Sequence, residues 1–274
     1  GDGRVHGTVI TTGAVTHRAA HRGPNMANIP SVPHGKTGIL WKMDGMYAAE
    51  CRQVFKVPEG RKLVGTDAAG IQLRVLAHYM NDPVYTEQVI DGDIHTFNKN
   101  ALGRFCKDRP TAKTFIYATL YGGGDGLIGK IVGGTAKDGK RLKADFDKNV
   151  PAFKKLKQEL NTAYQRGYLK GMDGRKLFVR SEHRCLSQLL QSAGAILCKQ
   201  WVALVDKELT AQKLDAYIMG WIHDEVQIAC RTEEVANHVG DITRRMAQET
   251  GRAFNIQLPI EAEFSVGATW SDTH

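Results

Sequence analysis

Residues 109–121, with the sequence RPTAKTFIYATLY, constrain the fold and the function more than any other segment. Arg109, Lys113, Tyr117 and Tyr121 recur at a spacing of four, and each such step on an α-helix advances about 40° around the axis. The four side chains therefore form one slowly winding ridge. The proline after the first arginine is tolerated in the first helical turn, and the three glycines that follow end the helix.

The order of side chains along this ridge suggests a ligand. Two cations followed by two aromatic rings suit a molecule with phosphates at one end and a flat ring at the other, which describes a nucleotide. A solvated helix face without a ligand has the same spacing, so both interpretations stay open on this segment alone. Phe115, Ile116 and Leu120 lie between the ridge residues. We expect them to pack on the opposite side and to present the ridge on a buried scaffold.

The composition sets the broad class of protein. The 274 residues are 42% hydrophobic and 24% charged, which suits one large globular domain or two closely associated subdomains. No segment approaches the ~20 apolar residues of a membrane span, and no signal-peptide pattern is present, so we expect a cytoplasmic protein without a membrane partner. The five scattered cysteines contain no CxxC pair, which indicates neither a disulfide framework nor a zinc site.

The charge of the chain indicates a polyanionic partner. The net charge is +8, and basic residues are dense over 130–157 and 4–22. A soluble basic protein without such a partner has the same charge, so charge alone does not decide. The chain opens on GDG without a methionine. We interpret it as a fragment of a longer polypeptide, a processed product or the product of tag cleavage.

Hydrophobic periodicity predicts an α+β fold. A short apolar strand over 62–67 precedes a helix over 71–80, and residues 216–230 form two β-rich runs of a hairpin with His223 and Asp224 at its tip. The other expected elements are loops and short strands over 1–60, a lysine-rich helical zone to about Lys170, an apolar helix over 186–209 interrupted at Gly194, a helix capped by Thr232, and a final strand over 260–266.

Two aspartates, Asp67 and Asp224, each end an apolar strand. A carboxylate in that place is costly to bury unless something compensates its charge, although a turn or capping role is the common alternative for either one. On adjacent strands of one sheet, the two would form an open oxygen-ligand site suited to Mg²⁺. Two such ions could activate an attacking hydroxyl and stabilise the leaving oxygen in an in-line phosphoryl transfer, with the cations of the ridge holding the phosphates.

The segments that carry these residues resemble motifs A, B and C of the family A (pol I-like) DNA polymerases: VGTDAAGIQLRVLAH, RPTAKTFIYATLYGGG and WIHDEVQ. The likeness runs through nearly the whole chain and is strongest to the replicative enzymes of short-tailed bacteriophages, whose location would be the host cytoplasm. It implies a polymerase palm, made of an antiparallel sheet with packed helices, and a helical fingers subdomain. We expect the palm over 1–80 and 181–274 and the fingers over 81–180.

The resemblance also implies roles for the residues that match each motif, with primer–template DNA and dNTPs as the substrates. The metal site would hold two Mg²⁺ ions through Asp67, the Ala68 carbonyl and Asp224, and Glu225 would assist without being essential. The triphosphate would be held by Arg109, Lys113 and His95. Lys113 would also protonate the leaving pyrophosphate, Tyr117 would stack on the nucleotide, and Tyr121 would accommodate the templating base.

DNA contacts follow from the same resemblance. Arg18 and Gln191 would probe the minor groove, where acceptors occur at similar places in every base pair, and His223 would touch the primer end. Each candidate also has an ordinary structural role open to it. Gln191 suits an interhelical hydrogen bond, Arg18 a solvated loop, His223 a turn, Glu225 a strand edge, and the helix start suits His95.

Two departures from the family pattern shape the expected activity. Gln72 stands where motif A usually has a glutamate that excludes a ribose 2′-hydroxyl. Glutamine keeps the bulk and can accept a hydrogen bond from Tyr117, but it lacks the charge, so we expect deoxyribose selection to survive in weakened form. Judged by the resemblance, we expect the chain to lack the exonuclease domain and most of the thumb, which a separate or upstream chain would have to supply.

Two other functions stay open. A non-catalytic nucleic-acid-binding or assembly subunit derived from a polymerase is one, although retention of both Asp67 and Asp224 argues against it. A single-subunit RNA polymerase is the other, and the bulk of Gln72 argues against that, because RNA synthesis needs room for the 2′-hydroxyl.

Overall fold

The computed structural model describes residues 2–35 and 38–273, which form two compact units. Unit 1 consists of the residues up to 69, 195–255, and those from 260 onward; unit 2 consists of 70–194 and 256–259. An antiparallel sheet lies in the first, and helices make up most of the second, which confirms the α+β class. The chain crosses between units at 69/70 and 194/195, and the subdomain boundaries expected from the sequence at 80/81 and 180/181 stay a prediction.

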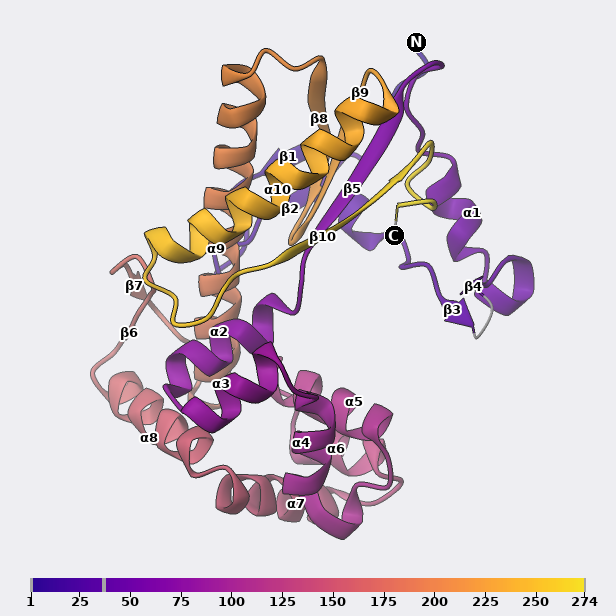
Figure 1. The fold of residues 1–274 in the computed structure, drawn as a ribbon. Coiled ribbons are helices and arrows are strands. Elements are labelled where there is room, and N and C mark those ends of the chain that lie inside the picture. The colour runs from indigo at the N-terminus through magenta and orange to yellow at the C-terminus, as the bar shows by residue number, and fades with distance from the viewer. Residues whose placement is uncertain (1, 36–37, 274) are drawn as a thin grey trace. The chain divides into compact units, whose positions relative to one another are not determined.

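A four-stranded antiparallel sheet with the order β10-β5-β9-β8 forms the centre of unit 1 (Figure 1). Its strands are β5 (Lys62–Ala68), β8 (Ala216–Ile222), β9 (Glu225–Cys230) and β10 (Ala262–Gly267). These bounds confirm the predicted strand over 62–67, the predicted hairpin and, two residues later than expected, the final strand. All six side chains of β9 are buried, because protein covers both faces of this central strand.

Helix α10 (Glu233–Ala253) covers one face of the sheet, and Figure 1 shows it running across the strands. The Thr66 and Thr243 hydroxyls are 3.0 Å apart and join β5 to the helix. Gly240 allows the close approach, because a Cβ there would lie 2.3 Å from the ring of Phe264 on β10. Because side chains alternate between the two faces of a strand, the residues next to these point to the opposite face of the sheet.

The opposite face of the sheet carries a hydrophobic cluster. Its buried members are Val57, Leu63, Ala229 and Trp270, with Met26, Ile29, Phe55 and Ile222 packed against it. The remaining elements of unit 1 are short, as the sequence predicts for residues 1–60. They are β1 (Thr8–Ile10), β2 (Ala20–Arg22), η1 (Met26–Asn28), β3 (His34–Gly35), β4 (Gly38–Ile39), η2 (Lys42–Gly45) and α1 (Ala48–Gln53).

The long helix α9 (Cys185–Ala211) runs without a break through Gly194, so the predicted interruption there is wrong. One glycine inside a helix costs only about 1 kcal/mol, which packing along the helix offsets. The glycine also has a local reason, because a Cβ at this position would lie 3.0 Å from the Gln72 amide nitrogen. Further along, the Trp201 indole donates to the Thr243 carbonyl at 2.9 Å and fixes α9 to α10.

Unit 2 is a set of helices around an aromatic core. Its helices are α2 (Ile71–Met80), α3 (Pro83–Ile90), α4 (Ile94–Leu102), η3 (Gly103–Phe105), α5 (Arg109–Leu120), α6 (Asp125–Ile131), α7 (Ala136–Asn149), α8 (Pro151–Gln165) and η4 (Glu182–Arg184), with a small hairpin of β6 (Leu169–Lys170) and β7 (Lys176–Leu177).

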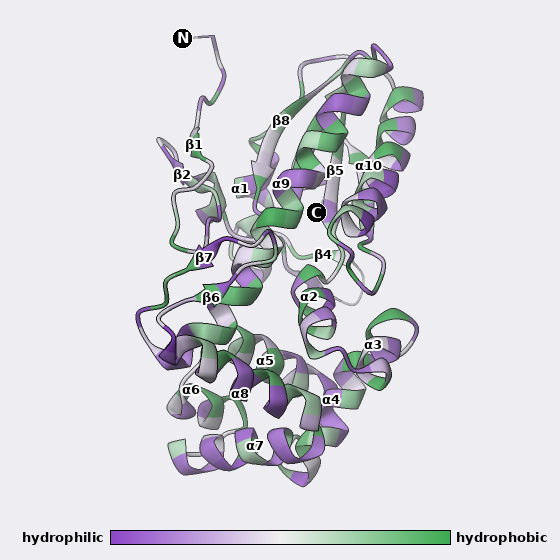
Figure 2. Cartoon of the chain, turned by 90° about the vertical axis from the view of Figure 1, so that its left-hand side faces the viewer, coloured by the Kyte–Doolittle hydropathy of each residue, from purple (hydrophilic) through white to green (hydrophobic). Residues whose placement is uncertain are grey.

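The core of this unit comes from one face of each amphipathic helix. The rings of Phe115, Phe146 and Phe153 pack in series, tilted and edge to face, with centroids 5.5 and 5.1 Å apart. Figure 2 shows hydrophilic and hydrophobic residues alternating along α7 and α8, as expected for helices with one buried face. Among the residues that the structure describes, no helix is long and apolar enough to span a membrane.

Candidate active site

The carboxylates predicted to bind metal lie at neighbouring positions in the sheet of unit 1. Strands β5 and β9 are adjacent, and Asp67 is paired with Glu225 in their register. The Ala68 amide donates to the Asp224 carbonyl at 2.9 Å, which fixes the hairpin tip beside the end of β5. On the other side of β5, Glu263 of β10 is also opposite Asp67. Paired residues on adjacent strands face the same side, so acidic groups gather at one edge.

The electrostatics of this edge favour a cation. The pKa of Asp67 is raised to about 8, first by lost hydration and then by the negative charges of Asp224, Glu225 and Glu263. Part of the Asp67 side chain is accessible to solvent, but the protein atoms around it still reduce its hydration. Burial also raises the pKa of Asp224, although the charge of Arg18 opposes the rise. Both carboxylates thus lack full compensation for their negative charge.

The donor set fits Mg²⁺ with help from other ligands. Among the residues that the structure describes, no three His, Cys, Asp or Glu side chains form a cluster able to hold a metal by themselves. Asp67, Asp224 and the Ala68 carbonyl supply hard oxygen atoms, and Mg²⁺ is usually bound by one or two carboxylates with water and substrate phosphates completing its shell. The residues present therefore fit an ion that arrives with a phosphate ligand.

The tip of the β8–β9 hairpin has a constrained backbone. His223 adopts a left-handed conformation with φ of 59°, which is unusual for a residue with a side chain. The Trp221 indole donates to the His223 carbonyl at 2.8 Å and holds this turn. The imidazole ring of His223 meets that of His21 edge to face, with centroids 5.9 Å apart. Burial, followed by the charges of Arg18 and His21, lowers the pKa of His223 to about 4, so the ring is neutral near pH 7.

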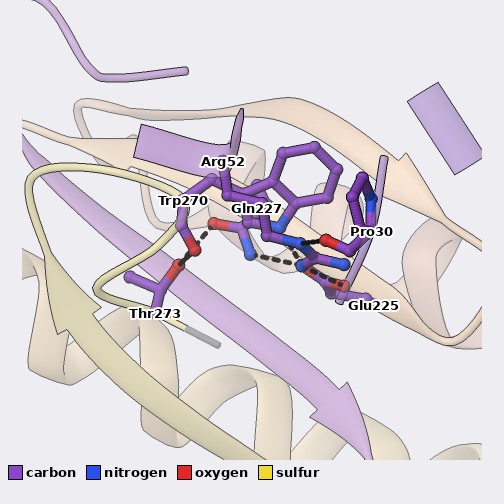
Figure 3. Close-up of polar contacts among 6 residues, drawn as sticks. All are labelled: Pro30, Arg52, Glu225, Gln227, Trp270 and Thr273. Atoms are coloured by element: carbon purple, nitrogen blue, oxygen red, sulfur yellow. Dashed lines mark hydrogen bonds and ion pairs between the residues drawn. The ribbon is translucent and has the colours of Figure 1, made fainter. Parts of the chain in front are cut away.

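Glu225 is buried and hydrogen-bonded on the same side of the sheet (Figure 3). Its Oε1 accepts from the Gln227 amide at 2.8 Å and from the Trp270 indole, and its Oε2 pairs with Arg52 at 3.5 Å. The sequence indicated an accessory role for Glu225. It gave no signal for Arg52 or Trp270, because neither lies in a recognisable motif and the contacts depend on the tertiary fold.

The predicted ridge is present on α5 in unit 2. Arg109, Lys113 and Tyr121 are exposed and Tyr117 is half-buried, while the predicted inner residues are buried: Phe115, Ile116 and Leu120, each at most 1% exposed. The Asp108 side chain caps the helix by accepting from the Thr111 amide at 2.8 Å. The structure thus confirms a presented ridge on a buried scaffold.

A second helix extends this face. His95 on α4 lies with its ring centroid 6.1 Å from that of Tyr117. Burial lowers the pKa of His95, and the charges of Arg109 and Lys113 lower it further. The Arg109 Nε donates to both carboxylate oxygens of Asp93, at 3.1 and 2.8 Å. Asp93 also caps α4. No signal in the sequence indicates its bond to Arg109, because that contact depends on how α4 and α5 pack.

The remaining predicted residues are distributed between the units. Gln72 is buried on α2, and Gln191 is half-buried on α9, both within unit 2. Arg18 follows His17, another left-handed residue with φ of 61°, in unit 1. The structure thus groups the acidic residues with Arg18 and His223, and it groups the cationic and aromatic ridge with His95. Glu263 was missed, because its place beside Asp67 depends on strand register.

An antiparallel sheet with acidic residues at the ends of adjacent strands, together with a helical unit that presents a cationic and aromatic ridge, defines a polymerase-type α+β protein. Comparison with known proteins agrees. The profile of DNA polymerase family A matches residues 1–272, and the chain therefore belongs to this family.

Individual relatives support the same assignment. The chain is 38% identical to a DNA-directed DNA polymerase of Enterobacteria phage T3 and 37% identical to that of Escherichia phage T7, in each case over 100% of this chain and 42% of the relative. It is 27% identical to DNA polymerase I of Aquifex aeolicus, over 98% of this chain and 46% of that protein. The chain thus spans less than half the length of the curated relatives it matches.

A solved structure has the same fold. The polymerase domain of Pol1 from M. smegmatis, in complex with DNA primer-template and dNTP, superposes with a TM-score of 0.83 at 21% identity. The match covers 99% of this chain and 49% of that one.

Proposed function

We propose that the chain catalyses template-directed transfer of deoxynucleotides from dNTPs to the 3′ end of a DNA primer. The observation that carries this proposal is the placement of Asp67 and Asp224 at adjacent strand ends, with the Ala68 amide bonded to the Asp224 carbonyl at 2.9 Å. Both carboxylates carry a raised pKa, so a cation would relieve an existing electrostatic cost. Membership in DNA polymerase family A supports the same reaction.

The predicted site residues of the two units have distinct parts in this reaction. Asp67, Asp224 and the Ala68 carbonyl would hold two Mg²⁺ ions, which when bound would favour ionisation of the primer hydroxyl and offset charge on the pyrophosphate. The primer 3′ hydroxyl gives its proton to water, and its oxygen bonds to the α-phosphorus as the bond to pyrophosphate breaks. Lys113 donates a proton to the leaving pyrophosphate, and His223 contacts the primer end.

The ridge on α5 binds the incoming nucleotide. Arg109 and His95, with Lys113, hold the phosphates, since they combine two cations and a neutral ring on adjacent helices. Tyr117 stacks on the nucleotide, and Tyr121, exposed at the end of the helix, accommodates the templating base. We infer that the helical unit must move during the cycle, because lids that carry binding groups usually close on substrate.

Further residues select the substrate. Gln72 excludes a ribose 2′-hydroxyl by its bulk, and its lack of charge weakens that exclusion. Arg18 and Gln191 contact the minor groove of the primer–template duplex, where they sense pair geometry. Because the chain spans 42% of its phage relatives, we propose that a separate or upstream polypeptide supplies thumb and exonuclease functions.

Primer extension in Mg²⁺ tests the proposal, with Asp224→Ala as the diagnostic variant. We expect single-nucleotide addition by the wild type and a loss of at least about 10³-fold in the variant. Asp215→Asn is the matched control, because Asp215 precedes β8 in the same unit and bonds to Arg61 at 2.7 Å instead of joining the acidic edge. Stable DNA binding with no incorporation at all would favour the non-catalytic binding subunit.

A further inference from the structure

The carboxylate of Glu225, which directly follows Asp224 in the chain, is held by side chains of the protein. Glu225 is 7% exposed and begins β9, directly after the tip. Its two oxygens engage Gln227, Trp270 and Arg52 (Figure 3). A carboxylate whose oxygens are both occupied by protein donors is poorly placed to coordinate an ion, and its contacts indicate a structural role.

Glu225 connects the tip of the β8–β9 hairpin with the turn that contains Trp270 and Thr273. The side-chain amide oxygen of Gln227, Oε1, accepts from the Thr273 hydroxyl at 3.0 Å, so the C-terminal turn lies over β9. Gly65 on β5 makes room for this contact, since a Cβ there would lie 2.5 Å from the Thr273 Cβ and 2.6 Å from the Gln227 amide nitrogen. Glu225 and Gln227 are two positions apart on β9 and therefore lie on the same face of the sheet. The terminal turn is bonded to Glu225 through Trp270 and to Gln227 through Thr273.

Arg52 completes the assembly as a buried cation. It is 5% exposed, its guanidinium carbon lies 4.3 Å from the centre of the Trp270 ring, and its Nε donates to the Pro30 carbonyl at 2.8 Å. It also pairs with Glu225, at 3.5 Å. A buried ion pair seldom adds net stability compared with apolar packing. Where it persists, fixing one arrangement over others is its best-attested use.

Resting on the proposed function, we propose that Trp270 and Arg52 are positioning residues for the metal carboxylate Asp224. They lock Glu225 from one side, and through it they fix the start of β9 and the direction of the adjacent Asp224 side chain. The Trp221 bond to the His223 carbonyl and the Ala68 bond to the Asp224 carbonyl hold the tip from other directions. The C-terminal turn is therefore part of the catalytic apparatus without touching substrate.

Paired tryptophan substitutions in the full chain test this proposal. Trp270→Phe keeps an aromatic ring under Arg52 and removes the indole donor to Glu225. Trp201→Phe is the matched control, because Trp201 is also buried in unit 1 and its indole also donates one hydrogen bond, to the Thr243 carbonyl. Thermal melting measures the structural cost of each, which we expect to be similar.

Two functional readouts separate positioning from stability. We expect Trp270→Phe to lower kcat for single-nucleotide addition by at least about 10-fold with KM for dNTP changed less than about 2-fold, and to weaken Mn²⁺ binding, followed by electron paramagnetic resonance, several-fold. Trp201→Phe should leave both near wild type. Arg52→Lys, which keeps the charge but not the planar stacking, should fall between Trp270→Phe and wild type.

The outcomes also distinguish this proposal from the proposed function. An active wild type with equal effects of Trp270→Phe and Trp201→Phe, or with an unchanged kcat in Trp270→Phe, overturns the positioning role and leaves the polymerase function standing. A wild type that neither extends primers nor binds Mn²⁺ overturns both. Weaker Mn²⁺ binding in Trp270→Phe alone, at matched melting temperature, supports the positioning role even before catalysis is measured.

Discussion

At the scale of single residues, the carboxylate of Asp67 that we propose to bind metal also destabilises the metal-free fold when it is ionised. Its pKa in the folded protein is about 8, against about 3.9 for an unfolded chain. Between these values the unfolded state is ionised while the folded state holds a proton, so the free energy of unfolding falls as pH rises from about 4 to about 8 and levels off above. Below about pH 4 both states are protonated and the residue has no effect.

This conflict predicts that Asp67→Asn stabilises the metal-free protein while abolishing primer extension. In EDTA at pH 8 we expect the free energy of unfolding to rise by on the order of 1 kcal/mol, after allowing for solvent screening of an accessible carboxylate. Urea denaturation at pH 5 and pH 8 measures it, with Asp215→Asn as the control. Added Mg²⁺ should stabilise the wild type and not the variant. A variant less stable than wild type at pH 8 would refute the electrostatic interpretation.

Gln72 gives a second prediction at this scale. It is 7% exposed and packs against Gly194, so its amide has little freedom to move aside. Gln72→Ala should lower the preference for dNTP over rNTP by at least about 10-fold in single-nucleotide incorporation, because the bulk that excludes the 2′-hydroxyl is gone. Gln188→Ala is the control, since Gln188 is also buried in unit 2 and bonds to the Phe178 carbonyl. Unchanged sugar preference in Gln72→Ala would assign selection to other residues.

At the scale of elements, the orientation of Arg109 depends on the cap of a neighbouring helix. Asp93 caps α4 and accepts two hydrogen bonds from the Arg109 Nε, so it restrains the direction of the guanidinium. Asp93→Asn keeps the capping oxygen and removes the charge. We expect KM for dNTP to rise about 3- to 10-fold with kcat little changed. Asp108→Asn, the equivalent change at the cap of α5, should leave KM within about 2-fold of wild type, and equal effects of both changes would contradict an orienting role.

The packing of α10 on the sheet gives a second prediction for elements. Gly240→Ala should lower the free energy of unfolding by about 1–3 kcal/mol, because the new methyl would lie 2.3 Å from the Phe264 ring. Gly126→Ala, on α6 with nothing within 4 Å of the added Cβ, should raise it by roughly 0.5–1 kcal/mol through helix propensity. Urea melts of both variants check the pair, and a stable Gly240→Ala would show that the helix can move away from the sheet.

Elements also mark the limit of prediction from sequence. The ridge on α5 was predictable, because its spacing and its end signals are local. Asp67 and Asp224 were recognised as strand-end carboxylates, but the adjacency of β5 and β9 follows from topology. Glu263 and the Trp270 contacts depend on register and on a packed C-terminal turn, which leave no periodic signal. The break expected at Gly194 was wrong, since packing around α9 outweighs the propensity of one residue.

At the scale of the whole molecule, the net charge of the 274-residue chain gives a prediction for the DNA binding that we propose. The charge of +8 supplies attraction that depends on counterion release. The chain also spans only 42% of the phage polymerases that it is similar to. We expect the dissociation constant for primer–template DNA to rise on the order of 100-fold between about 50 and about 200 mM KCl, corresponding to roughly four phosphate contacts. Fluorescence anisotropy across that range measures the slope.

Weak binding has a kinetic consequence that the same preparation can test. If the complex dissociates faster than it adds nucleotides, one binding event yields only one or a few additions. With heparin added as a trap at about 150 mM KCl, we expect products extended by a few nucleotides, lengthening as salt is lowered because dissociation slows. Asp224→Ala should bind DNA with the same salt dependence and extend no primer, which separates DNA binding from catalysis. Long products from a single binding event at moderate salt would show that these two units grip DNA without further chains.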